Sequence, residues 1–521
     1  MAFDINKMLL ADVYDHPATS IRLLETHISW IVLTGDYAYK IKKPVNFGFL
    51  DFSSLQQRRH FCEQEIVLNR RLSSNIYLTA VAISEQQDKL ILDESNIVEY
   101  AVKMRQFAQT ALFDNMLAAG QLTGSHMDAL ARRVALFHQQ AQRADDSMPY
   151  GQAEDVHQPV MENFRQIHQQ LTGQHYDERL SWLEKWCQTA FGQLKTVLDQ
   201  RKRDGFVREC HGDMHLANLI WLQDPEQENS AGVPMAFDCI EFNQQLRWID
   251  VMSEIAFLVM DLQHRNQAIL AQRFLNTYLE VSGDYAGLSV LTYYLSYRAL
   301  VRAKVNALRL GQQGINRQQR QHTMVEFESY LDLAKTYTRR SALQLIIMRG
   351  VSASGKSTVS QQLVDHMGAI RVRSDIERKR LFRLDPDEHA QSAVGDGLYT
   401  EKGSERTYQK LQQLAAQIFA AGYSVIVDAA FLQQQQRLPF VRLAQKLGLA
   451  YVILQTSAPA EVLRQRIVSR EHGPSDANLD VLEYQLARWQ ELDTDELAHA
   501  ITLDTTQLVD LPVLIRQIQH Q

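Results

Sequence analysis

The spacing of apolar residues predicts a β-rich start followed by a long helical region. Short apolar or alternating runs, bounded by turn residues such as Gly35, predict strands at 28–33, 37–41, 78–84, 89–92 and 98–104. Apolar residues at helical spacing predict helices at 61–72, 127–140, 176–201, 247–261, 293–310 and 323–337. This order is typical of an α+β fold with a small β-rich lobe and a larger helical lobe.

From residue 343 onward, predicted strands and helices alternate. The strands are expected at 343–348, 369–373, 424–427 and 451–455, and the clearest helices at 358–367 and 460–470. Such alternation is typical of an α/β fold with a doubly wound, mainly parallel sheet. A boundary at 338–342 gives two predicted domains, 1–340 and 341–521.

Composition and charge narrow the class of protein. The 521 residues are 45% hydrophobic and 22% charged, as in an ordinary globular protein, and the net charge of −7 gives no bulk attraction to nucleic acid or anionic membranes. The four cysteines are far apart and include no C-x-x-C pair, which argues against a disulfide framework or zinc site. Without a signal peptide or a long apolar run, we expect a soluble cytoplasmic protein with no membrane partner.

Residues 348–358, which read M-R-G-V-S-A-S-G-K-S-T, contain a phosphate-binding loop. Every fixed position of G-x-x-x-x-G-K-[ST] is filled, and the loop stands between a predicted strand and a predicted helix. The glycines let backbone N–H groups surround a phosphate, the lysine reaches the β- and γ-phosphates, and the following serine hydroxyl binds Mg²⁺. We therefore expect this domain to bind ATP or GTP with Mg²⁺. The predicted nucleotide-binding residues are Gly350, Ser354, Gly355, Lys356, Ser357 and Thr358.

The first domain carries a lysine and an acid in a kinase-like order. Lys40 and Lys42 alternate onto the same face of the second predicted strand, and Glu65 lies in the helix predicted at 61–72. Protein kinases hold the α- and β-phosphates with a strand lysine paired to a helix glutamate. A surface lysine and a solvated helix acid would give the same sequence.

Residues 208–222, R-E-C-H-G-D-M-H-L-A-N-L-I-W-L, strengthen the kinase interpretation. Asp213 and Asn218 have the spacing of the kinase catalytic loop, with His211 two positions before the aspartate. Asp238 follows a strand predicted at 233–237, where a kinase holds Mg²⁺. On this pattern Asp213 accepts the proton of the attacking hydroxyl, while Asn218 and Asp238 bind the metal.

The stretch H-G-D-M-H-L-A-N at 211–218 resembles the H-G-D-x-H-x-x-N motif of the aminoglycoside phosphotransferase family, which has a protein-kinase-like fold. The resemblance extends over residues 21–337 and implies phosphoryl transfer to a hydroxyl, without fixing the acceptor. It implies a catalytic base, two Mg²⁺ ligands, a nucleotide lysine and its partner at Asp213, Asn218, Asp238, Lys40 and Glu65.

Two features depart from the family pattern. The metal motif at 238–242 reads D-C-I-E-F rather than D-F-G, and the sequence has no clear glycine-rich loop over the phosphates. Lys42 could take the place of Lys40 in the lysine–glutamate pair. Downstream, the helix predicted at 293–310 has a basic face that either lines the acceptor cleft or faces solvent; it carries Arg298, Arg302, Lys304 and Arg309.

In the second domain, a charged segment follows the strand predicted at 369–373. It resembles the R-x-D-x-x-R pattern of small P-loop kinases such as polynucleotide kinases, gluconate kinases and zeta-type toxins. The resemblance implies that Asp375 is the general base and that Arg378 binds the acceptor or a phosphate. A helix N-cap with a charged first turn is the alternative.

Three further residues are candidates in this domain. Asp428 ends the strand predicted at 424–427 and is expected to bind Mg²⁺. Arg466 and Arg470 share one face of the helix predicted at 460–470. In small P-loop kinases such arginines come from a mobile lid and stabilise charge at the γ-phosphate, although a solvated helix would also carry them.

The two domains in this order resemble a bacterial family that fuses an aminoglycoside-phosphotransferase-like domain to a zeta-toxin-like ATPase domain. We expect an enzyme with two nucleotide sites that transfers the γ-phosphoryl group of ATP or GTP to small-molecule hydroxyls through Mg²⁺. Alternatively, the P-loop domain is a nucleotide-driven switch, or a kinase directed at a polynucleotide or protein. The acceptors and the oligomeric state stay open.

Overall fold

The computed structural model describes residues 3–48, 50–171, 176–223, 232–312, 314–339, 341–384, 400–469 and 478–521. Contacts divide the chain into two units. The first comprises Met1–Asp261 and Tyr293–Ala334, and the second Leu262–Thr292 and Lys335–Gln521. Each unit is described by itself.

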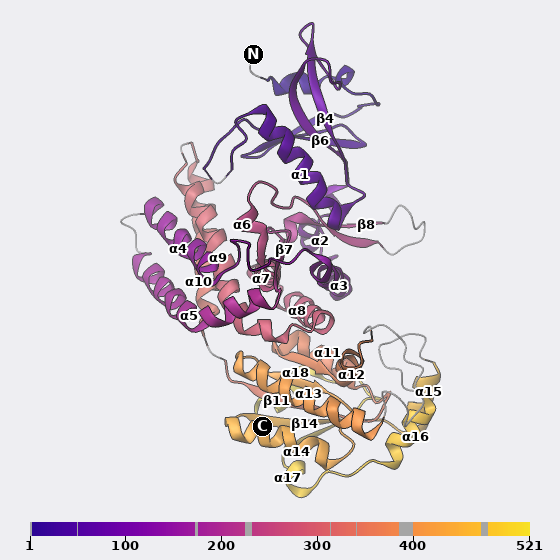
Figure 1. Ribbon diagram of the computed structural model, residues 1–521. Coiled ribbons are helices and arrows are strands. Elements are labelled where there is room, and N and C mark those ends of the chain that lie inside the picture. Colours follow the sequence, from indigo (N-terminus) through magenta and orange to yellow (C-terminus); the bar gives the residue numbers. More distant parts are fainter. Residues whose placement is uncertain are drawn as a thin grey trace. The chain divides into compact units, whose positions relative to one another are not determined.

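The first unit begins with an antiparallel sheet in the order β1-β2-β3-β6-β4-β5. Its strands are β1 (Arg22–Glu25), β2 (Ser29–Leu33), β3 (Tyr37–Lys42), β4 (Tyr77–Gln86), β5 (Lys89–Ile91) and β6 (Ile97–Arg105). Helix α1 (Leu55–Ser73) lies across β4 and β6 (Figure 1). It begins six residues before the predicted helix because Ser54 and Gln57 form a capping box.

The alternation of β3 positions the first candidate site. Tyr39 and Ile41 enter the hydrophobic core on one face of the sheet. Lys40 and Lys42 therefore point to the other face, where they meet α1.

The rest of the first unit is mainly helical. Two short antiparallel pairs hold its loops: β7 (Val207–Glu209) with β10 (Trp248–Asp250), and β8 (Leu219–Leu222) with β9 (Val233–Ala236). The helices are α2 (Phe113–Ala118), α3 (Gly124–Gln140), α4 (Ala153–Gln170), α5 (Asp177–Arg203), α6 (Gln244–Arg247), most of α7 (Val251–His264) and of α9 (Leu288–Leu310), and α10 (Arg317–Thr336).

The helix predicted at 247–261 is wrong over its first turn. Trp248–Asp250 pairs with β7 as strand β10, and α7 begins only at Val251. Asp250 fixes this boundary, because its carboxylate accepts the Met252 N–H at 2.9 Å and forms a buried salt bridge with Arg201 at 2.6 Å. A local apolar pattern contains no information on β7 or Arg201, the two partners that are distant in the sequence.

The second unit has a parallel sheet in the order β12-β13-β11-β14-β15. Its strands are β11 (Gln344–Arg349), β12 (Ile370–Arg373), β13 (Val425–Asp428), β14 (Ala450–Ser457) and β15 (Ala500–Asp504). The helices are α8 (Ala268–Ser282), α11 (Lys356–Met367), α12 (Ser374–Leu381), α13 (Glu401–Ala420), α14 (Gln434–Leu447), α15 (Ala460–Val468), α16 (Leu479–Ala487), α17 (Thr494–Leu497) and α18 (Leu511–Gln519). Ile346 and Met348 pack against α11 and α18, while α13 and α14 form another helical layer on the sheet. The predicted fold class, an α+β kinase-like part followed by an α/β P-loop domain, is confirmed.

Helix α8 packs on the P-loop sheet although it lies within the predicted domain 1–340. The Asn276 amide donates to the Ala369 carbonyl oxygen at 3.2 Å and accepts the Arg371 N–H at 2.8 Å. One side chain thus satisfies two backbone groups beside the edge strand β12, where a neighbouring strand would otherwise be needed.

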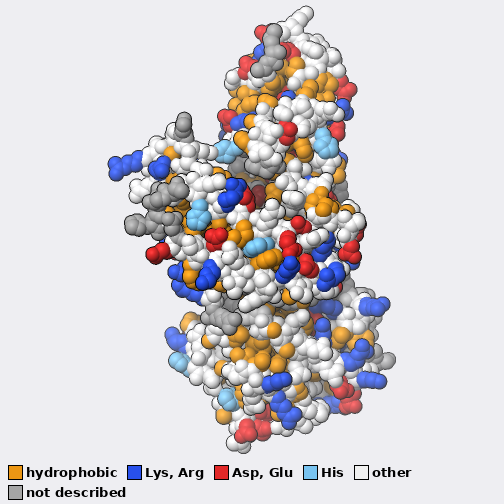
Figure 2. Space-filling model, turned by 60° about the vertical axis from the view of Figure 1, so that its left-hand side comes forward, with side chains coloured by type: hydrophobic (Ala, Val, Ile, Leu, Met, Phe, Trp, Pro, Cys, Tyr) orange, Lys and Arg blue, Asp and Glu red, His pale blue; other side chains and the backbone are white. Residues whose placement is uncertain are grey.

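Side chains of all classes share the surface. On the face drawn in Figure 2, acidic, basic and hydrophobic side chains are interspersed. Among the described residues, none of the helices has the length and apolar composition needed to cross a bilayer.

Candidate active sites

Lys40 connects three elements of the kinase-like unit. From β3, its Nζ donates to Glu65 Oε1 of α1 at 2.8 Å, and it also binds Asp238, which follows β9. Burial opposes the charge of Lys40, but Asp238 and Glu65 raise its pKa well above the usual value. The structure therefore brings three of the predicted site residues together, with Lys40 cationic.

Lys42 belongs to the same cluster and lies deeper. Its Nζ donates to Glu65 Oε2 at 2.6 Å and to Glu241, and its side chain is only 1% exposed. Burial would raise the pKa of Glu65, but the two lysines lower it to about 2. Of the two lysines, Lys40 is the one beside Asp238. Glu241 was not predicted to belong to the site. The only sequence feature that could have pointed to it is its position three residues after Asp238.

The catalytic-loop candidates contact each other directly. Asn218 Nδ2 donates to Asp213 Oδ2 and to its carbonyl oxygen, both at 3.0 Å. His215 Nε2 lies 3.4 Å from Asp213 Oδ2. Burial would raise the pKa of Asp213, but His215, His211 and Arg298 hold it below the usual value. This arrangement presents a partly exposed carboxylate, and among the described residues no hydrogen bond to Asn218 Oδ1 is found.

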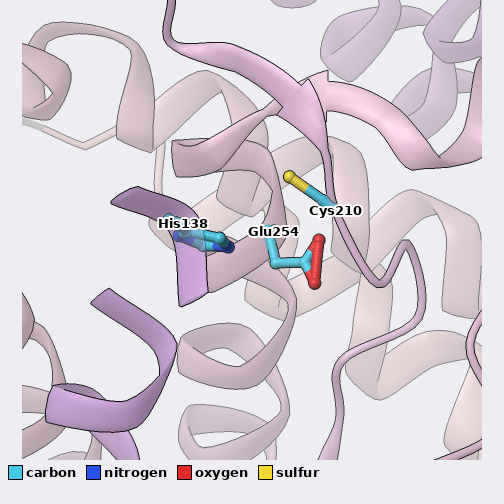
Figure 3. Close-up of side chains that lie close together, drawn as sticks. All are labelled: His138, Cys210 and Glu254. Carbon is cyan, nitrogen blue, oxygen red and sulfur yellow. The ribbon is translucent and has the colours of Figure 1, made fainter. Parts of the chain in front are cut away.

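Glu254 holds the loop from behind. Its carboxylate accepts the backbone N–H groups of His211 and Gly212 at 2.9 to 3.1 Å. His138 and Cys210 lie beside it, with the three potential ligand atoms within 4.8 Å of one another (Figure 3). Such side chains also suit a transition metal, but the Glu254 carboxylate already accepts the two N–H groups of the loop.

Asp238 has an unusual backbone conformation. Its φ is +61°, in the left-handed region that is uncommon for residues other than glycine. Its N–H donates to the Tyr77 hydroxyl at 3.0 Å, and the next N–H, of Cys239, donates to Asn69 Oδ1 at 2.9 Å. These two bonds offset the strain and aim the carboxylate at Lys40.

The predicted basic face on α9 is divided between buried and exposed positions. Arg298 is 6% exposed and Arg302 is partly buried, whereas Arg309 faces solvent. Arg298 and Arg302 are both within electrostatic reach of Asp213.

In the second unit, the phosphate-binding loop has the backbone that its glycines require. Gly350 has φ +155°, and a Cβ there would lie 2.5 Å from side-chain oxygens of Ser354 and Thr456. Gly355 has φ +88° and precedes α11. The Ser354 hydroxyl turns inward to Thr456 at 2.8 Å, and the Ser354 N–H donates to the Val351 carbonyl oxygen at 3.2 Å. Lys356 Nζ donates to the Val351 carbonyl oxygen at 2.8 Å.

A cavity of about 1320 Å³ brings together most of the remaining candidates. Its lining includes Ser357, Thr358, Asp375, Arg378, Asp428 and Arg466. Asp428 ends β13 and accepts the Ser360 hydroxyl at 2.9 Å. Asp375 lies in the first turn of α12, so both carboxylates follow strands at the same edge of the parallel sheet.

Arg466 contacts the phosphate-binding loop directly. Its Nη1 donates to the Ala353 carbonyl oxygen at 3.2 Å and to Thr505 Oγ1 at 3.0 Å. Its Nη2 donates to the Thr505 carbonyl oxygen at 2.8 Å. Arg470 lies outside the described residues.

Glu280 and Arg371 were missed by the sequence analysis, and Arg373, the first arginine of the R-x-D-x-x-R pattern, was given no role there. Glu280, on α8, forms salt bridges with Arg371 at 2.8 Å and with Arg373 at 3.5 Å. Arg371 Nη1 also donates to the Ser360 hydroxyl at 3.1 Å, and Ser360 in turn donates to Asp428. No local sequence pattern could connect Glu280 with these arginines, because it lies more than 90 residues before them.

Comparisons with known proteins found one matching family model and three similar relatives. A family model described as AAA domain matches residues 345–492. Uncharacterized proteins of Mycobacterium bovis and Mycobacterium tuberculosis are 30% identical over 482 residues, covering 92% of this chain and of each relative.

Several solved kinase structures are also similar. A sugar kinase from Janibacter is 25% identical and covers 34% of this chain and 94% of its own, with a TM-score of 0.27. A putative aminoglycoside phosphotransferase from Ralstonia eutropha is 14% identical and covers 64% of this chain and 98% of its own length, with a TM-score of 0.38. An ethanolamine kinase from Plasmodium vivax is 9% identical and covers 62% of this chain and 85% of its own length, also with a TM-score of 0.38. At 30% identity over 92% of both chains, the protein belongs to the same family as these mycobacterial proteins, and residues 345–492 match the AAA domain model.

Proposed function

We propose that the protein is an ATP-dependent phosphotransferase with two nucleotide sites, each acting on a small-molecule hydroxyl. The observation that carries the proposal is the pair of contacts made by Lys40, to Glu65 and to Asp238. A surface lysine would not be buried between two carboxylates from separate elements. In the second unit, the matched phosphate loop and the cavity beside it support a second site.

At the first site, Asp213 accepts the proton of the acceptor hydroxyl. The hydroxyl oxygen forms a bond to the γ-phosphorus, the bond from that phosphorus to the β,γ-bridging oxygen breaks, and ADP leaves. Lys40 binds the α- and β-phosphates, and Glu65 orients Lys40. The Asn218 amide donates to Asp213 and holds the carboxylate toward the acceptor.

At the second site the same chemistry uses other residues. Lys356 and the loop N–H groups bind the phosphates, Asp375 accepts the acceptor proton, and Arg378 binds the acceptor or a phosphate. Arg466 joins the loop to Thr505 and stabilises charge on the transferred group.

The donor atoms fit Mg²⁺ at both sites. Asn218 and Asp238 in one unit, and Ser357 and Asp428 in the other, offer the oxygen ligands that this hard cation prefers. When bound, Mg²⁺ neutralises charge on the β- and γ-phosphates. The four cysteines are free and buried, which supports a reducing, cytoplasmic location.

The test uses the full chain with γ-labelled ATP and a panel of hydroxyl compounds. Asp213→Asn and Lys356→Ala are each expected to reduce transfer to a different set of acceptors by roughly 10²- to 10⁴-fold, and the double variant to abolish both. Asp146→Asn and Lys446→Ala, at exposed positions, are the matched controls.

If neither substitution reduces transfer, the two-site proposal is wrong. If Asp213→Asn removes all transfer while Lys356→Ala changes only nucleotide binding, the P-loop domain is a switch rather than a second kinase.

A further inference from the structure

Two arginines on α9 lie one helical turn apart beside the candidate base Asp213. Because residues four apart share a helix face, Arg298 and Arg302 point in similar directions. Burial lowers the pKa of Arg302, but Tyr330, Asp261 and Asp213 together raise it. Arg298 in turn contributes to the lowered pKa of Asp213.

Packed contacts fix the position of Arg298. Its Nε donates to the Ser253 carbonyl oxygen at 3.0 Å, and its guanidinium lies 4.8 Å from the Phe257 ring centre. That ring packs edge-on against His215 at 5.3 Å, and His215 lies 3.4 Å from Asp213. Arg298 is therefore a permanent positive charge behind the site.

The contacts of Arg302 involve its Nε and the face of its guanidinium. Its Nε donates to the Tyr330 hydroxyl at 3.5 Å, and the guanidinium lies 5.8 Å from the ring centre. Within the described part of the chain, no residue accepts a hydrogen bond from its two Nη atoms, and the side chain is partly exposed. The nearby Asp261 carboxylate accepts the Leu216 N–H at 3.0 Å and so is used to hold the catalytic loop.

We propose that the acceptor of the kinase-like site carries a carboxylate or phosphate near its reactive hydroxyl, and that Arg302 binds this anion. A guanidinium fork matches both groups with two parallel hydrogen bonds. An ammonium group in the same place would face two guanidinium groups, so the arrangement also excludes cationic acceptors. This inference rests on the proposed function of Asp213.

The experiment uses the full chain carrying Lys356→Ala, so that transfer reports the kinase-like site. Two sets of acceptors share a scaffold and differ in charge: glycerol, glycerate, glycerol 3-phosphate and 3-amino-1,2-propanediol, and glucose, glucuronate, glucose 6-phosphate and glucosamine. Transfer from γ-labelled ATP is measured for each compound. Binding is measured calorimetrically with AMP-PNP and Mg²⁺ present.

We expect an anionic member of a set to bind and react best, and the carboxylate and phosphate arms show which anion is preferred. Arg302→Gln is expected to raise KM for that acceptor roughly 10- to 100-fold, with kcat and the KM for ATP nearly unchanged. Arg302→Lys restores part of the loss, and Arg309→Gln, on the exposed face of the same helix, has no effect.

The inference is overturned if neutral or cationic members are preferred in both sets, if no anionic member binds more tightly than its neutral counterpart, or if Arg302→Gln matches Arg309→Gln. The proposed function fails separately, when transfer to every acceptor persists in Asp213→Asn.

Discussion

Glu280 forms a salt bridge with Arg371 at 2.8 Å, and this pair ties α8 to the edge strand of the P-loop sheet. The carboxylate is 9% exposed and also lies 3.5 Å from Arg373. Arg371 in turn donates to Ser360, which donates to Asp428. A residue far from the phosphate loop in sequence thus supports one of its candidate Mg²⁺ ligands.

Replacing Glu280 should weaken the second unit. Glu280→Gln removes the carboxylate that pairs with the nearly buried Arg371 and lies 3.5 Å from Arg373, so we expect a loss of about 3 kcal/mol in the free energy of unfolding. Urea unfolding of the full chain measures it. Glu461→Gln is the control, because that side chain is 75% exposed and its salt bridge with Arg464 is long, at 3.8 Å. Equal urea midpoints for the two variants would contradict the role of Glu280.

The two lysines of the kinase-like unit should respond differently to substitution. Lys40→Met removes the residue beside Asp238, so kcat/KM for ATP at this site should fall at least about 10²-fold while the fold persists. Lys42→Met leaves Glu241 buried without its partner and should cost about 3 kcal/mol of stability. Kinetics and urea unfolding in the Lys356→Ala chain distinguish the two. If Lys42→Met lowers only activity, the two roles are reversed.

Arg466 should contribute to nucleotide binding at the P-loop. Arg466→Ala removes the hydrogen bonds that join the Ala353 carbonyl oxygen to Thr505, so the loop loses a fixed neighbour. We expect the Kd for AMP-PNP at this site to rise roughly tenfold, measured by calorimetry in the Lys40→Met chain. Arg464→Ala, two positions earlier and bound to Glu483, should leave the Kd unchanged. The same Kd in both variants would refute this contribution.

His138 should make stability depend on pH. Burial, then the charges of Arg208 and Arg71, lowers its pKa to about 3, against about 6.5 when unfolded. Between these two pKa values the unfolded chain binds a proton that the folded chain does not. The contribution of His138 to the free energy of unfolding is therefore fully present above pH 6.5 and is lost as the pH decreases, by about 1.4 kcal/mol per pH unit at most.

His138→Gln removes this titration. We expect its free energy of unfolding to change less between pH 7.5 and 5.5 than that of the wild-type chain, as measured by urea unfolding. His520→Gln, at an exposed position, should keep the wild-type slope. Parallel slopes for His138→Gln and the wild type would rule out His138 as the source.

Much of the candidate chemistry was predictable because it lies in short motifs. The phosphate loop depends on glycines whose backbone conformations follow from local sequence, and Gly350 and Gly355 have the positive φ values expected. Asp213 and Asn218 are five residues apart and contact each other within one loop. The sequence left Lys40 and Lys42 as alternatives, because alternation places both on one face.

By itself, the amino-acid sequence determined two folds and two nucleotide motifs, because hydrophobic periodicity and loop glycines act over a few residues. Only the tertiary structure decided that Lys40 rather than Lys42 lies beside Asp238, that Trp248–Asp250 is a strand, and that α8 packs on the P-loop sheet. Each of these depends on partners distant in sequence, such as Glu241 for Lys42 and Arg371 for Glu280. The free energy of such contacts arises from burial and charge pairing that exist only after the chain has folded.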